Sequence, residues 1–336
     1  MSSSPIVIVG AGVLGLCTAF ELHRRGRAMV VIDPGEVNAS LVAAGMIAPA
    51  MESAIDDVSP DHALLFRAGR DLWPAFAAAA GIVLAHRPAE WRGGDADGME
   101  ARLRALGFKA RREGDRITTD EDYQVDPEQA LSALKQALGE AVVIGRVTGI
   151  ARTDRSWRVS VGDLTLDAEA VVLATGAGEA VAGLPEAARV LIDGIQPIRG
   201  QIGVAARDLV DHVVRGPGAY VAPMASGAVI GATMEPGRRD TGPDAETSER
   251  LAQAAWRVLD RSPEPVDIQW RAGVRGATAD GLPLAGAAPG GQGLLMALAP
   301  RRNGWLLGPL VGAIVADVIE GRAALMEARA LDPGRF

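Results

Sequence analysis

The sequence predicts an α/β fold, in which a parallel sheet with crossover helices is combined with a separate antiparallel α+β region. Two observations predict it. Near the start, an apolar strand, a glycine-rich turn, a helix and a second apolar strand follow one another within residues 5–33. Between residues 196 and 232, short alternating strands are separated by turns at 216–218 and 226–227, as in antiparallel sheets.

The opening segment has the features of a Rossmann-like βαβ unit. Residues 6–9 are an apolar run that predicts a buried parallel strand. Gly10, Gly12 and Gly15 predict a tight turn, a bare backbone that can face a pyrophosphate, and close packing of the following helix. That helix starts at Val13 and Leu14, so we expect its first N–H groups to point at phosphate oxygens.

Charge marks the end of this unit. The helix ends in basic residues 23–25 and Gly26, which suits the negative end of a helix dipole. The next strand, 29–32, leads into Asp33, roughly 20 residues after the glycines, where a carboxylate can accept hydrogen bonds from ribose hydroxyls. The order of these elements predicts a dinucleotide site and leaves open which dinucleotide binds.

The following segments are less regular. Residues 34–50 are rich in small side chains, which suggests that the backbone passes close to a large flat ligand. Residues 85–122 predict only short elements over a pocket. A helix is expected near 60–80, and its core face carries Leu64, Leu65, Ala68, Leu72 and Phe76.

The middle and end of the chain return to the parallel pattern. Asp126 is predicted to cap a helix that has Pro127 in its first turn and Gln129 closing a capping box. A later strand ends in Ala174 to Gly178, small residues at the edge where open α/β sheets bind ligands. We expect further strands at 142–144, 157–161, 164–166, 170–174 and 293–297, and helices at 246–260 and from Pro309.

Composition narrows the function classes. The 336 residues carry a net charge of −8 with 34 scattered basic residues, which argues against nucleic acid as a partner. A single cysteine, Cys17, excludes internal disulfides and favours a reducing compartment. The start lacks a basic n-region, and the longest apolar tract, 305–319, is short and broken, so we expect a cytoplasmic protein without membrane spans. The four histidines fall in no ligand pattern, and no metal site is predicted.

Seven segments resemble the flavin-dependent D-amino acid oxidase superfamily, most closely its glycine oxidase branch, in the same order along most of the chain. They are IVIVGAGVLG at 6–15, ASLVAAGMIAP at 39–49, LATGAG at 173–178, QPIRGQ at 196–201, YVAPMASGAVIGATMEPG at 220–237, AGVRGATADGLPLAG at 272–286 and RRNGWLLGP at 301–309. The resemblance implies FAD, bound non-covalently because the late cysteine used for covalent attachment in some members is absent.

The resemblance also implies a division of the chain. An FAD-binding domain of the glutathione-reductase type would comprise residues 1–77, 124–193 and 276–336, and a substrate-binding domain residues 78–123 and 194–275. The expected cofactor-binding residues are Gly10, Gly12, Val13, Leu14, Gly15, Asp33, Ser40, Ala43, Ala44, Gly45, Met46, Thr175, Gly176, Arg302, Asn303, Gly304, Trp305 and Leu306.

For the substrate, the resemblance places Arg275 and Arg302 as partners of an amino acid carboxylate, because a planar guanidinium binds a carboxylate bidentately. Tyr220 would add a hydroxyl, and Met46 and Met234 would line the wall. Arg301 is the alternative to Arg302 as a carboxylate partner, and Arg302 is favoured because it directly precedes Asn303. The implied reaction is hydride transfer from the substrate Cα to flavin N5, giving an imine that hydrolyses to a 2-oxo acid and ammonia, with dioxygen reduced to hydrogen peroxide.

The sequence leaves several alternative functions open. Ala299 to Arg301 and Gly276 depart from the Gly-His and proline that relatives often carry, which leaves substrate range and oxygen reactivity unsettled. The alternatives are a sarcosine or other secondary-amine oxidase, an amino acid dehydrogenase that reduces a quinone, an NAD(P)-dependent dehydrogenase and an FAD-carrying subunit of a larger complex. A homo-oligomer and, by resemblance, a role in thiamine biosynthesis also stay open.

Overall fold

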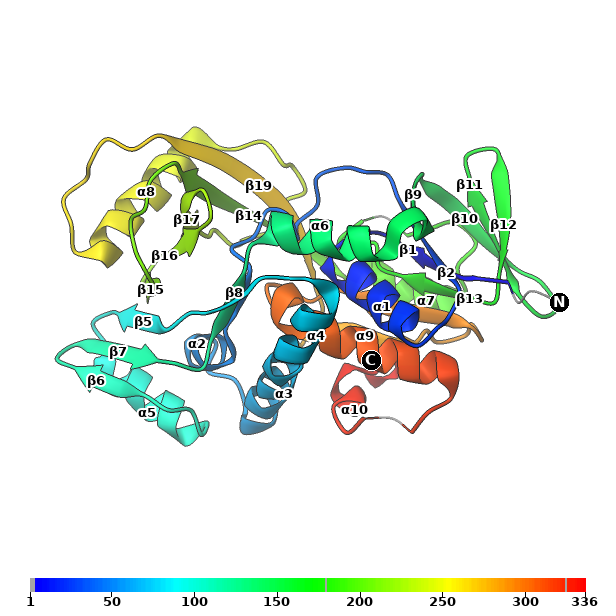
Figure 1. Cartoon of the computed structure of the whole chain (residues 1–336), viewed down its shortest axis with the longest axis horizontal. Helices are drawn as coiled ribbons and strands as arrows, with labels where there is room; N and C mark the ends of the chain where they lie inside the picture. The colour runs from blue at the N-terminus through cyan, green and yellow to red at the C-terminus, as the bar shows by residue number, and fades with distance from the viewer. Residues whose placement is uncertain (1–3, 179, 324) are drawn as a thin grey trace.

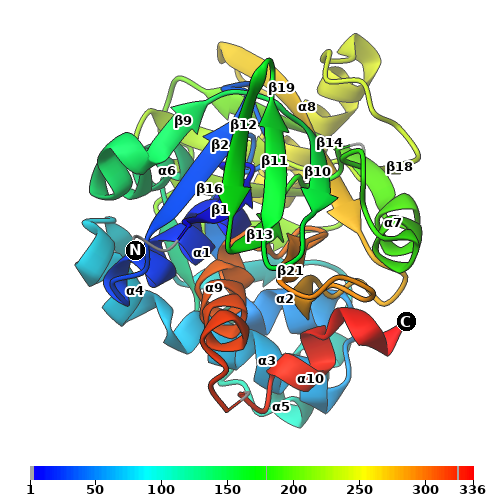
Figure 2. The same ribbon diagram turned by 90° about the vertical axis from the view of Figure 1, so that its right-hand side faces the viewer.

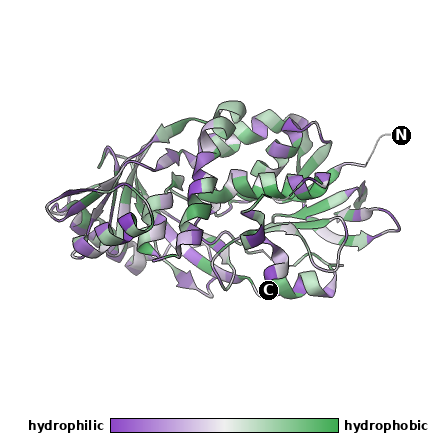
Figure 3. Cartoon of the chain, turned by 90° about the horizontal axis from the view of Figure 1, so that it is seen from below, coloured by the Kyte–Doolittle hydropathy of each residue, from purple (hydrophilic) through white to green (hydrophobic). Residues whose placement is uncertain are grey.

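The computed structural model describes residues 4–178, 180–323 and 325–336. The molecule is elongated, with a six-stranded sheet toward one end and a nine-stranded sheet toward the other (Figure 1). The hydropathy view shows apolar strands running through the interior of both halves (Figure 3). The predicted α/β class with parallel and antiparallel sheets is confirmed.

The six-stranded sheet has the order β20-β21-β13-β1-β2-β9. β1 is fully apolar and pairs in parallel with both β13 and β2, so it lies at the centre of the predicted βαβ unit. β20 runs antiparallel to β21 and forms one edge. The strands are β1 (Ile6–Val9), β2 (Met29–Asp33), β9 (Val142–Ile144), β13 (Ala170–Leu173), β20 (Leu284–Ala287) and β21 (Leu294–Leu298).

Both faces of this sheet are covered. Alternate side chains of β1 divide between them: Ile6 and Ile8 join a core with the helices α1, α6 and α9, whereas Val7 and Val9 join one with β10, β11 and α7. Figure 2 shows the three-stranded sheet β10-β11-β12 on the outer face. These elements are α1 (Val13–Arg24), α6 (Pro127–Leu138), α7 (Glu186–Asp193), α9 (Gly304–Glu320), β10 (Val147–Arg152), β11 (Trp157–Val161) and β12 (Leu164–Ala168).

The nine-stranded sheet has the order β18-β14-β17-β16-β15-β5-β7-β6, and β19 pairs with β14 over ten residues. One of its faces packs on α8, and the opposite face contributes Val213, Ala222 and Val229 to a core with segment 42–51. The elements are β5 (Ala89–Arg92), β6 (Arg111–Glu113), β7 (Arg116–Thr119), β14 (Gln196–Ala205), β15 (Val213–Gly216), β16 (Ala219–Met224), β17 (Gly227–Gly231), β18 (Glu235–Pro236), β19 (Ile268–Ala277) and α8 (Ala245–Leu259).

The remaining elements are another small sheet and the helices and 3-10 turns that pack around the two larger sheets. β3, β8 and β4 form a small sheet that connects segment 46–47 to segment 123–125. The elements are β3 (Met46–Ile47), β4 (Leu84–His86), β8 (Tyr123–Val125), α2 (Pro49–Ile55), α3 (Pro60–Asp71), α4 (Trp73–Ala80), α5 (Ala96–Ala105), η1 (Gly139–Ala141), α10 (Ala328–Leu331) and η2 (Pro333–Arg335).

Two predicted helices differ from the structure. The helix expected near 60–80 is two helices, because Pro74 starts a new one within its first turn. Of the residues predicted on its core face, Leu64 is 58% and Leu72 38% exposed. The last helix starts at Gly304, not at Pro309. Pro309 lies inside it, in its second turn, where the missing N–H removes only one hydrogen bond.

Side-chain pairing in the 126–139 helix is only partly as predicted. Asp126 caps it by accepting from the N–H groups of Glu128 and Gln129. The Gln129 side chain does not close a capping box. It bonds instead to the backbone of Gly81 and Val83, which ties α6 to the end of α4.

The domain limits remain a proposal, and the strand assignments support them. Every strand of the six-stranded sheet lies within residues 1–77, 124–193 or 276–336. The nine-stranded sheet draws on residues 78–123 and 194–275, with β19 ending two residues later, at Ala277. The β3-β8-β4 sheet spans both parts, so the division does not follow every hydrogen-bonded pair.

Candidate active site

The glycine-rich turn lies at the carboxyl end of β1, beside the end of β13, where loops diverge from the parallel sheet. This is the place at which open α/β sheets bind nucleotides. Gly12 caps α1 in an extended conformation and brings no side chain to the helix N-terminus. The first turn of α1 therefore presents backbone N–H groups at the end of the sheet, although the N–H of Val13 is already bonded to the Ser40 hydroxyl.

Gly10 and Gly15 have no room for a side chain. Gly10 has φ +112°, and a Cβ there would lie 2.5 Å from the carbonyl oxygen of Ala174. A Cβ on Gly15 would lie 2.1 Å from the carbonyl oxygen of Gly10. Both obstacles are backbone atoms, which cannot move aside as a flexible side chain can. The two glycines hold the strand, the turn and the helix close together, as a dinucleotide site requires.

Gly15→Ala is expected to lower the free energy of unfolding by about 1–3 kcal/mol, because the new methyl group forces α1 away from the turn. FAD affinity should fall at the same time. Chemical denaturation and FAD titration measure the two effects. Gly94→Ala is the matched control, since nothing lies within 4 Å of a Cβ at that position. Equal stability and FAD affinity in the two variants would contradict the role given to Gly15.

Asp33 and Ser40 order the backbone around the turn. The Asp33 carboxylate accepts hydrogen bonds from the N–H groups of Ala11 at 2.7 Å and Gly35 at 2.8 Å. The Ser40 hydroxyl accepts from the N–H of Val13 at 2.9 Å. Asp33 and Ser40 were predicted as cofactor ligands, which stays a prediction. In the structure, both side chains support the glycine turn from within the protein.

The other predicted cofactor residues divide into three groups. Together with Arg302, one pocket of the described structure is lined by Ala43, Ala44, Gly45, Met46, Asn303 and Trp305. Thr175 and Gly176 follow β13, next to the glycine turn in the sheet order. Leu14 and Leu306 are buried in the helical core, and Gly304 packs against Val13, so these positions offer backbone atoms rather than side chains.

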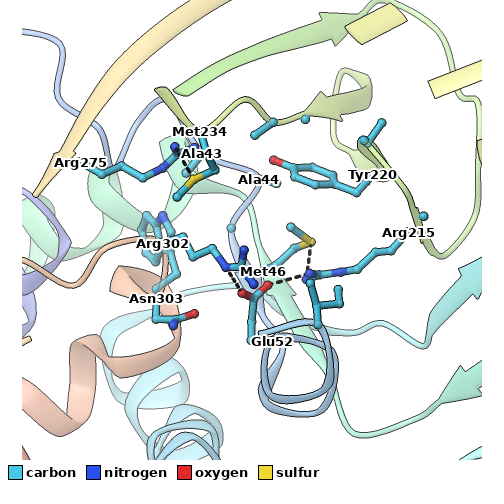
Figure 4. Close-up of a pocket in the computed structure, with 18 of the residues that line it drawn as sticks. Ala43, Ala44, Met46, Glu52, Arg215, Tyr220, Met234, Arg275, Arg302 and Asn303 are labelled. Atoms are coloured by element: carbon cyan, nitrogen blue, oxygen red, sulfur yellow. Dashed lines mark hydrogen bonds and ion pairs between the residues drawn. The ribbon is translucent and has the colours of Figure 1, made fainter. Parts of the chain in front are cut away.

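The pocket has a volume of about 360 Å³ and lies between the nine-stranded sheet, segment 43–55 and the start of α9. Arg275 projects into it from β19, and Arg215 enters from β15 on the opposite side (Figure 4). Tyr220 faces the same space from β16, directly opposite Arg215 in the strand register. The cavity suits a small polar molecule.

Arg275 is the pocket guanidinium without an acidic partner among the described residues. Its contacts are the carbonyl oxygen of Thr233 at 3.4 Å, which is a long hydrogen bond, and the sulfur of Met234 at 3.6 Å, which is a weak acceptor. Its side chain lies across Gly200, where a Cβ would be 2.0 Å from Nη1. Burial lowers the pKa of the Arg275 guanidinium. A bound carboxylate would satisfy this group.

Arg302 also lines the pocket, but protein carboxylates already face it. Its Nε donates to Glu52, and its Nη2 lies 3.0 Å from Asp56. The two arginines predicted to bind the substrate carboxylate thus differ in their surroundings: Arg302 already has two carboxylate neighbours, and Arg275 has none among the described residues. Their roles toward a substrate stay a prediction. Arg301 pairs with Asp56 at 2.8 Å and is not part of the pocket wall.

Glu52 connects two of the pocket arginines. It is 7% exposed; one carboxylate oxygen accepts from Arg215 at 2.6 Å and the other from Arg302. Burial alone would raise the pKa of Glu52, but the charges and hydrogen bonds of Arg302 and Arg215 outweigh it and lower that pKa to about 2. Glu52 is therefore ionised at neutral pH and holds both guanidiniums in place.

Tyr220, Met46 and Met234 all line the pocket, as expected. Burial raises the pKa of the Tyr220 hydroxyl, and the nearby charges of Arg275, Arg215 and Arg302 act in the opposite direction. Tyr220 is thus a neutral hydrogen-bond donor at neutral pH. The sulfurs of Met46 and Met234 contact Arg215 and Arg275, respectively. Trp305 donates to the carbonyl oxygen of Ser40 at 3.1 Å and also forms part of the wall.

Asp122 is a buried acid within electrostatic range of Glu52 and Arg215. It is 2% exposed, and neither carboxylate oxygen has a well-formed hydrogen bond among the described residues. Burial raises the pKa of Asp122 from 3.8 to about 7, and the charge of Glu52 acts in the same direction. Asp122 is therefore protonated in weakly acidic solution and ionises around neutral pH.

Asp122→Asn is expected to stabilise the protein above pH 7, by about 4 kcal/mol at most. The folded pKa lies above the unfolded value, so wild-type stability falls as the pH rises from about 4 to about 7 and then levels off. The neutral amide of the variant does not ionise, so the variant does not lose this stability. Thermal denaturation of both proteins at pH 4.5 and pH 8 measures the difference. If the wild-type midpoint changes with pH just as the midpoint of the variant does, the prediction is wrong.

Arg215 and Glu52 were missed in the sequence analysis, as was Trp91, which also lines the pocket. A signal was present. Arg215 follows two buried valines in a predicted strand region, and Glu52 lies in the apolar run Ala48 to Ala54. A charged residue in such surroundings needs a partner of opposite charge. Within the described ranges, no group of three or more metal-ligating side chains comes together, and no helix is long and apolar enough to cross a bilayer.

Comparison with known proteins gives the chain a family. The FAD dependent oxidoreductase family, DAO, matches residues 5–318. A glycine oxidase from Geobacillus kaustophilus is 30% identical over 364 residues, which cover 94% of this chain and 92% of the relative. The crystal structure of glycine oxidase from Geobacillus kaustophilus has a TM-score of 0.85 and 26% identity, with 100% of both chains covered.

Another relative is larger. The tRNA 5-methylaminomethyl-2-thiouridine biosynthesis bifunctional protein MnmC from Caulobacter sp. (strain K31) is 29% identical over 357 residues, which cover 98% of this chain and 57% of the relative. The chain thus spans little more than half of that protein, but nearly all of the glycine oxidase.

These findings confirm FAD as the cofactor and disfavour the NAD(P)-dependent alternative. The predicted enzyme class, an FAD-dependent oxidoreductase of amino acids or amines, is confirmed at the level of the family. By its sequence and its fold, the chain belongs to the FAD dependent oxidoreductase family DAO, close to the glycine oxidases.

Proposed function

We infer that the protein oxidises a small amino acid or amine at the carbon that bears the nitrogen, with glycine and small D-amino acids as the first candidates. The observation that carries this proposal is Arg275, a half-buried guanidinium that lines a pocket of about 360 Å³ and has no acidic partner among the described residues. The glycine oxidase relatives support it. The products are an imine, hydrolysed to a 2-oxo acid and ammonia, and hydrogen peroxide when dioxygen is the acceptor.

The glycine turn, Asp33 and Ser40 would hold the dinucleotide part of FAD, and segment 43–46 with residues 302–305 would border its ring in the pocket. Bound FAD supplies the acceptor for a hydride from the substrate carbon. We expect no covalent bond to FAD through sulfur, because the single cysteine, Cys17, is buried in the core.

The residues of the chain do three things in this proposal. Arg275 binds the carboxylate and orients the adjacent C–H bond, and positioning of this kind supplies much of the catalysis. Tyr220 donates a hydrogen bond to the same carboxylate. The surplus of guanidiniums disfavours a second positive charge, so the bound amine is held in its neutral form, the form that can lose a hydride.

Anaerobic mixing of the purified holoenzyme with glycine, D-alanine and sarcosine tests the proposal. Bleaching of the flavin absorbance is the expected result, and peroxide release after air is admitted shows that dioxygen is the acceptor. Bleaching without peroxide, but with reduction of an added quinone, would favour the dehydrogenase alternative. If none of these amines bleaches the flavin, the proposed function is wrong.

Sarcosine and other secondary amines form a second candidate class. The relative that matches 98% of this chain has a methylaminomethyl group in its printed name, which favours a pocket that accepts a substituted nitrogen. The ratio of kcat/KM for sarcosine to that for glycine decides between the two classes.

A further inference from the structure

The charge of the pocket exceeds what a substrate with one carboxylate needs. Three guanidiniums line it, those of Arg215, Arg275 and Arg302, and Glu52 is the one acidic side chain among the described lining residues. Both oxygens of Glu52 are engaged, one by Arg215 and one by Arg302. The lining residues thus carry a net charge of +2, and counting the adjacent pair of Arg301 and Asp56 leaves that value unchanged. A single substrate carboxylate would neutralise one of these charges.

The two ends of the pocket are both equipped for an anion. Arg275 and Arg215 enter from opposite sides, from β19 and β15, with the Tyr220 hydroxyl facing the space between them (Figure 4). Besides Glu52, the only contact of the Arg215 guanidinium in the described structure is the sulfur of Met46 at 3.2 Å. A thioether is a weak acceptor, and Nε of Arg215 is buried without a partner. Arg215 therefore has unused donor capacity at the pocket wall.

The neighbouring acids do not remove this surplus. Asp56 is shared between Arg301 and Arg302, so its charge is balanced away from Arg215. Asp122 has no hydrogen-bonded partner and is buried, a setting that favours the protonated acid. Guanidiniums held in a low-dielectric cavity attract anions more strongly than exposed ones do, because solvent screens them less.

We propose that the substrate is a small amine with two carboxylates, one bound by Arg275 and the second by Arg215, which makes Arg215 the specificity-determining residue of the pocket. An N-carboxymethyl amino acid such as iminodiacetate and an acidic amino acid such as D-aspartate belong to this class. This inference rests on the proposed function, since it names the substrate class of the same site.

The first test uses the wild-type holoenzyme and matched substrates. Iminodiacetate is compared with sarcosine, and D-aspartate with D-asparagine, which has nearly the same shape but no second charge. We expect kcat/KM for the better diacid to exceed that of its partner by about tenfold or more, mainly through KM. Calorimetric titration should also show malonate binding about tenfold more tightly than acetate, a readout that needs no turnover.

The second test changes Arg215. Arg215→Gln should reduce the diacid preference at least tenfold and remove the advantage of malonate over acetate, whereas Arg215→Lys should retain part of both. Arg207→Gln is the control, because Arg207 forms an exposed pair with Glu264 outside the pocket, and its preference should equal that of the wild type. If Arg215→Gln does not fold, the wild-type comparisons decide.

The outcomes separate the two proposals. Oxidation of glycine or sarcosine with no preference for diacids, and equal binding of malonate and acetate, would overturn this inference and leave the proposed function intact. Oxidation of no amine in either panel would overturn both. A diacid preference that persists in Arg215→Gln would overturn the assignment to Arg215.

Discussion

Arg275→Leu is expected to lower kcat/KM for the preferred amino acid by a factor between about thirty and several thousand. This loss corresponds to about 2–5 kcal/mol of transition-state stabilisation. The reason is that Arg275 is the pocket guanidinium without an acidic partner in the described structure, so the substrate carboxylate takes that place. Without it, a desolvated carboxylate is left unpaired, and the reacting carbon loses its alignment. Steady-state kinetics and anaerobic reduction rates measure the loss.

Arg271→Leu is the matched control for this variant. Arg271 lies on the same strand, β19, but is exposed and is not part of the pocket wall. The kcat/KM of the Arg271→Leu variant should stay close to that of the wild type. Unchanged kinetics in Arg275→Leu, with the FAD spectrum intact, would remove Arg275 from the binding site.

Glu52→Gln is expected to destabilise the protein by about 3–5 kcal/mol. The buried Glu52 carboxylate balances Arg215 and Arg302, and loss of one partner of a buried ion pair leaves the remaining charges uncompensated. The folded pKa of Glu52 is about 2, below the unfolded value of 4.5. Its contribution to stability is therefore present above pH 4.5 and is lost as the pH falls from about 4.5 toward 2.

Denaturation curves at pH 7 and pH 3 measure both parts of this prediction. The variant should be less stable at pH 7, and the difference from the wild type should shrink at pH 3. Glu264→Gln serves as the control, because the Arg207–Glu264 pair is about half exposed and such pairs contribute about 0–1 kcal/mol. A loss in Glu52→Gln that is no larger than the loss in Glu264→Gln would contradict the structural role of Glu52.

Local patterns predicted much of the fold. The βαβ unit from β1 to Asp33 is as expected, because each of its signals, the apolar run, the glycines and the terminal acid, acts within a few residues. The two errors in helix limits occurred where an apolar pattern continued past a proline. Pro74 begins a new helix, whereas Pro309 lies within one, and local sequence does not distinguish these outcomes because the packing of the helices decides them.

The candidate site was predicted only in part. Arg275, Arg302, Tyr220, Met46 and Met234 all line one pocket, although they lie on separate segments of the chain. The roles of the arginines were not predictable, because a charge is free or compensated only in relation to neighbours that are remote in sequence. Arg302 meets Glu52, which is 250 residues away, and Arg215 meets the same carboxylate across 163 residues.

The sequence by itself determined the α/β class, the dinucleotide turn and the family, since these depend on short motifs whose chemistry is local. Only the tertiary structure decided which pocket guanidinium lacks an acidic partner among the described residues and that Arg215 shares the pocket. The physical reason is that electrostatic pairing acts through space: the ionisation of Glu52 and the surplus positive charge around it exist only once β15, α2 and the start of α9 are packed together.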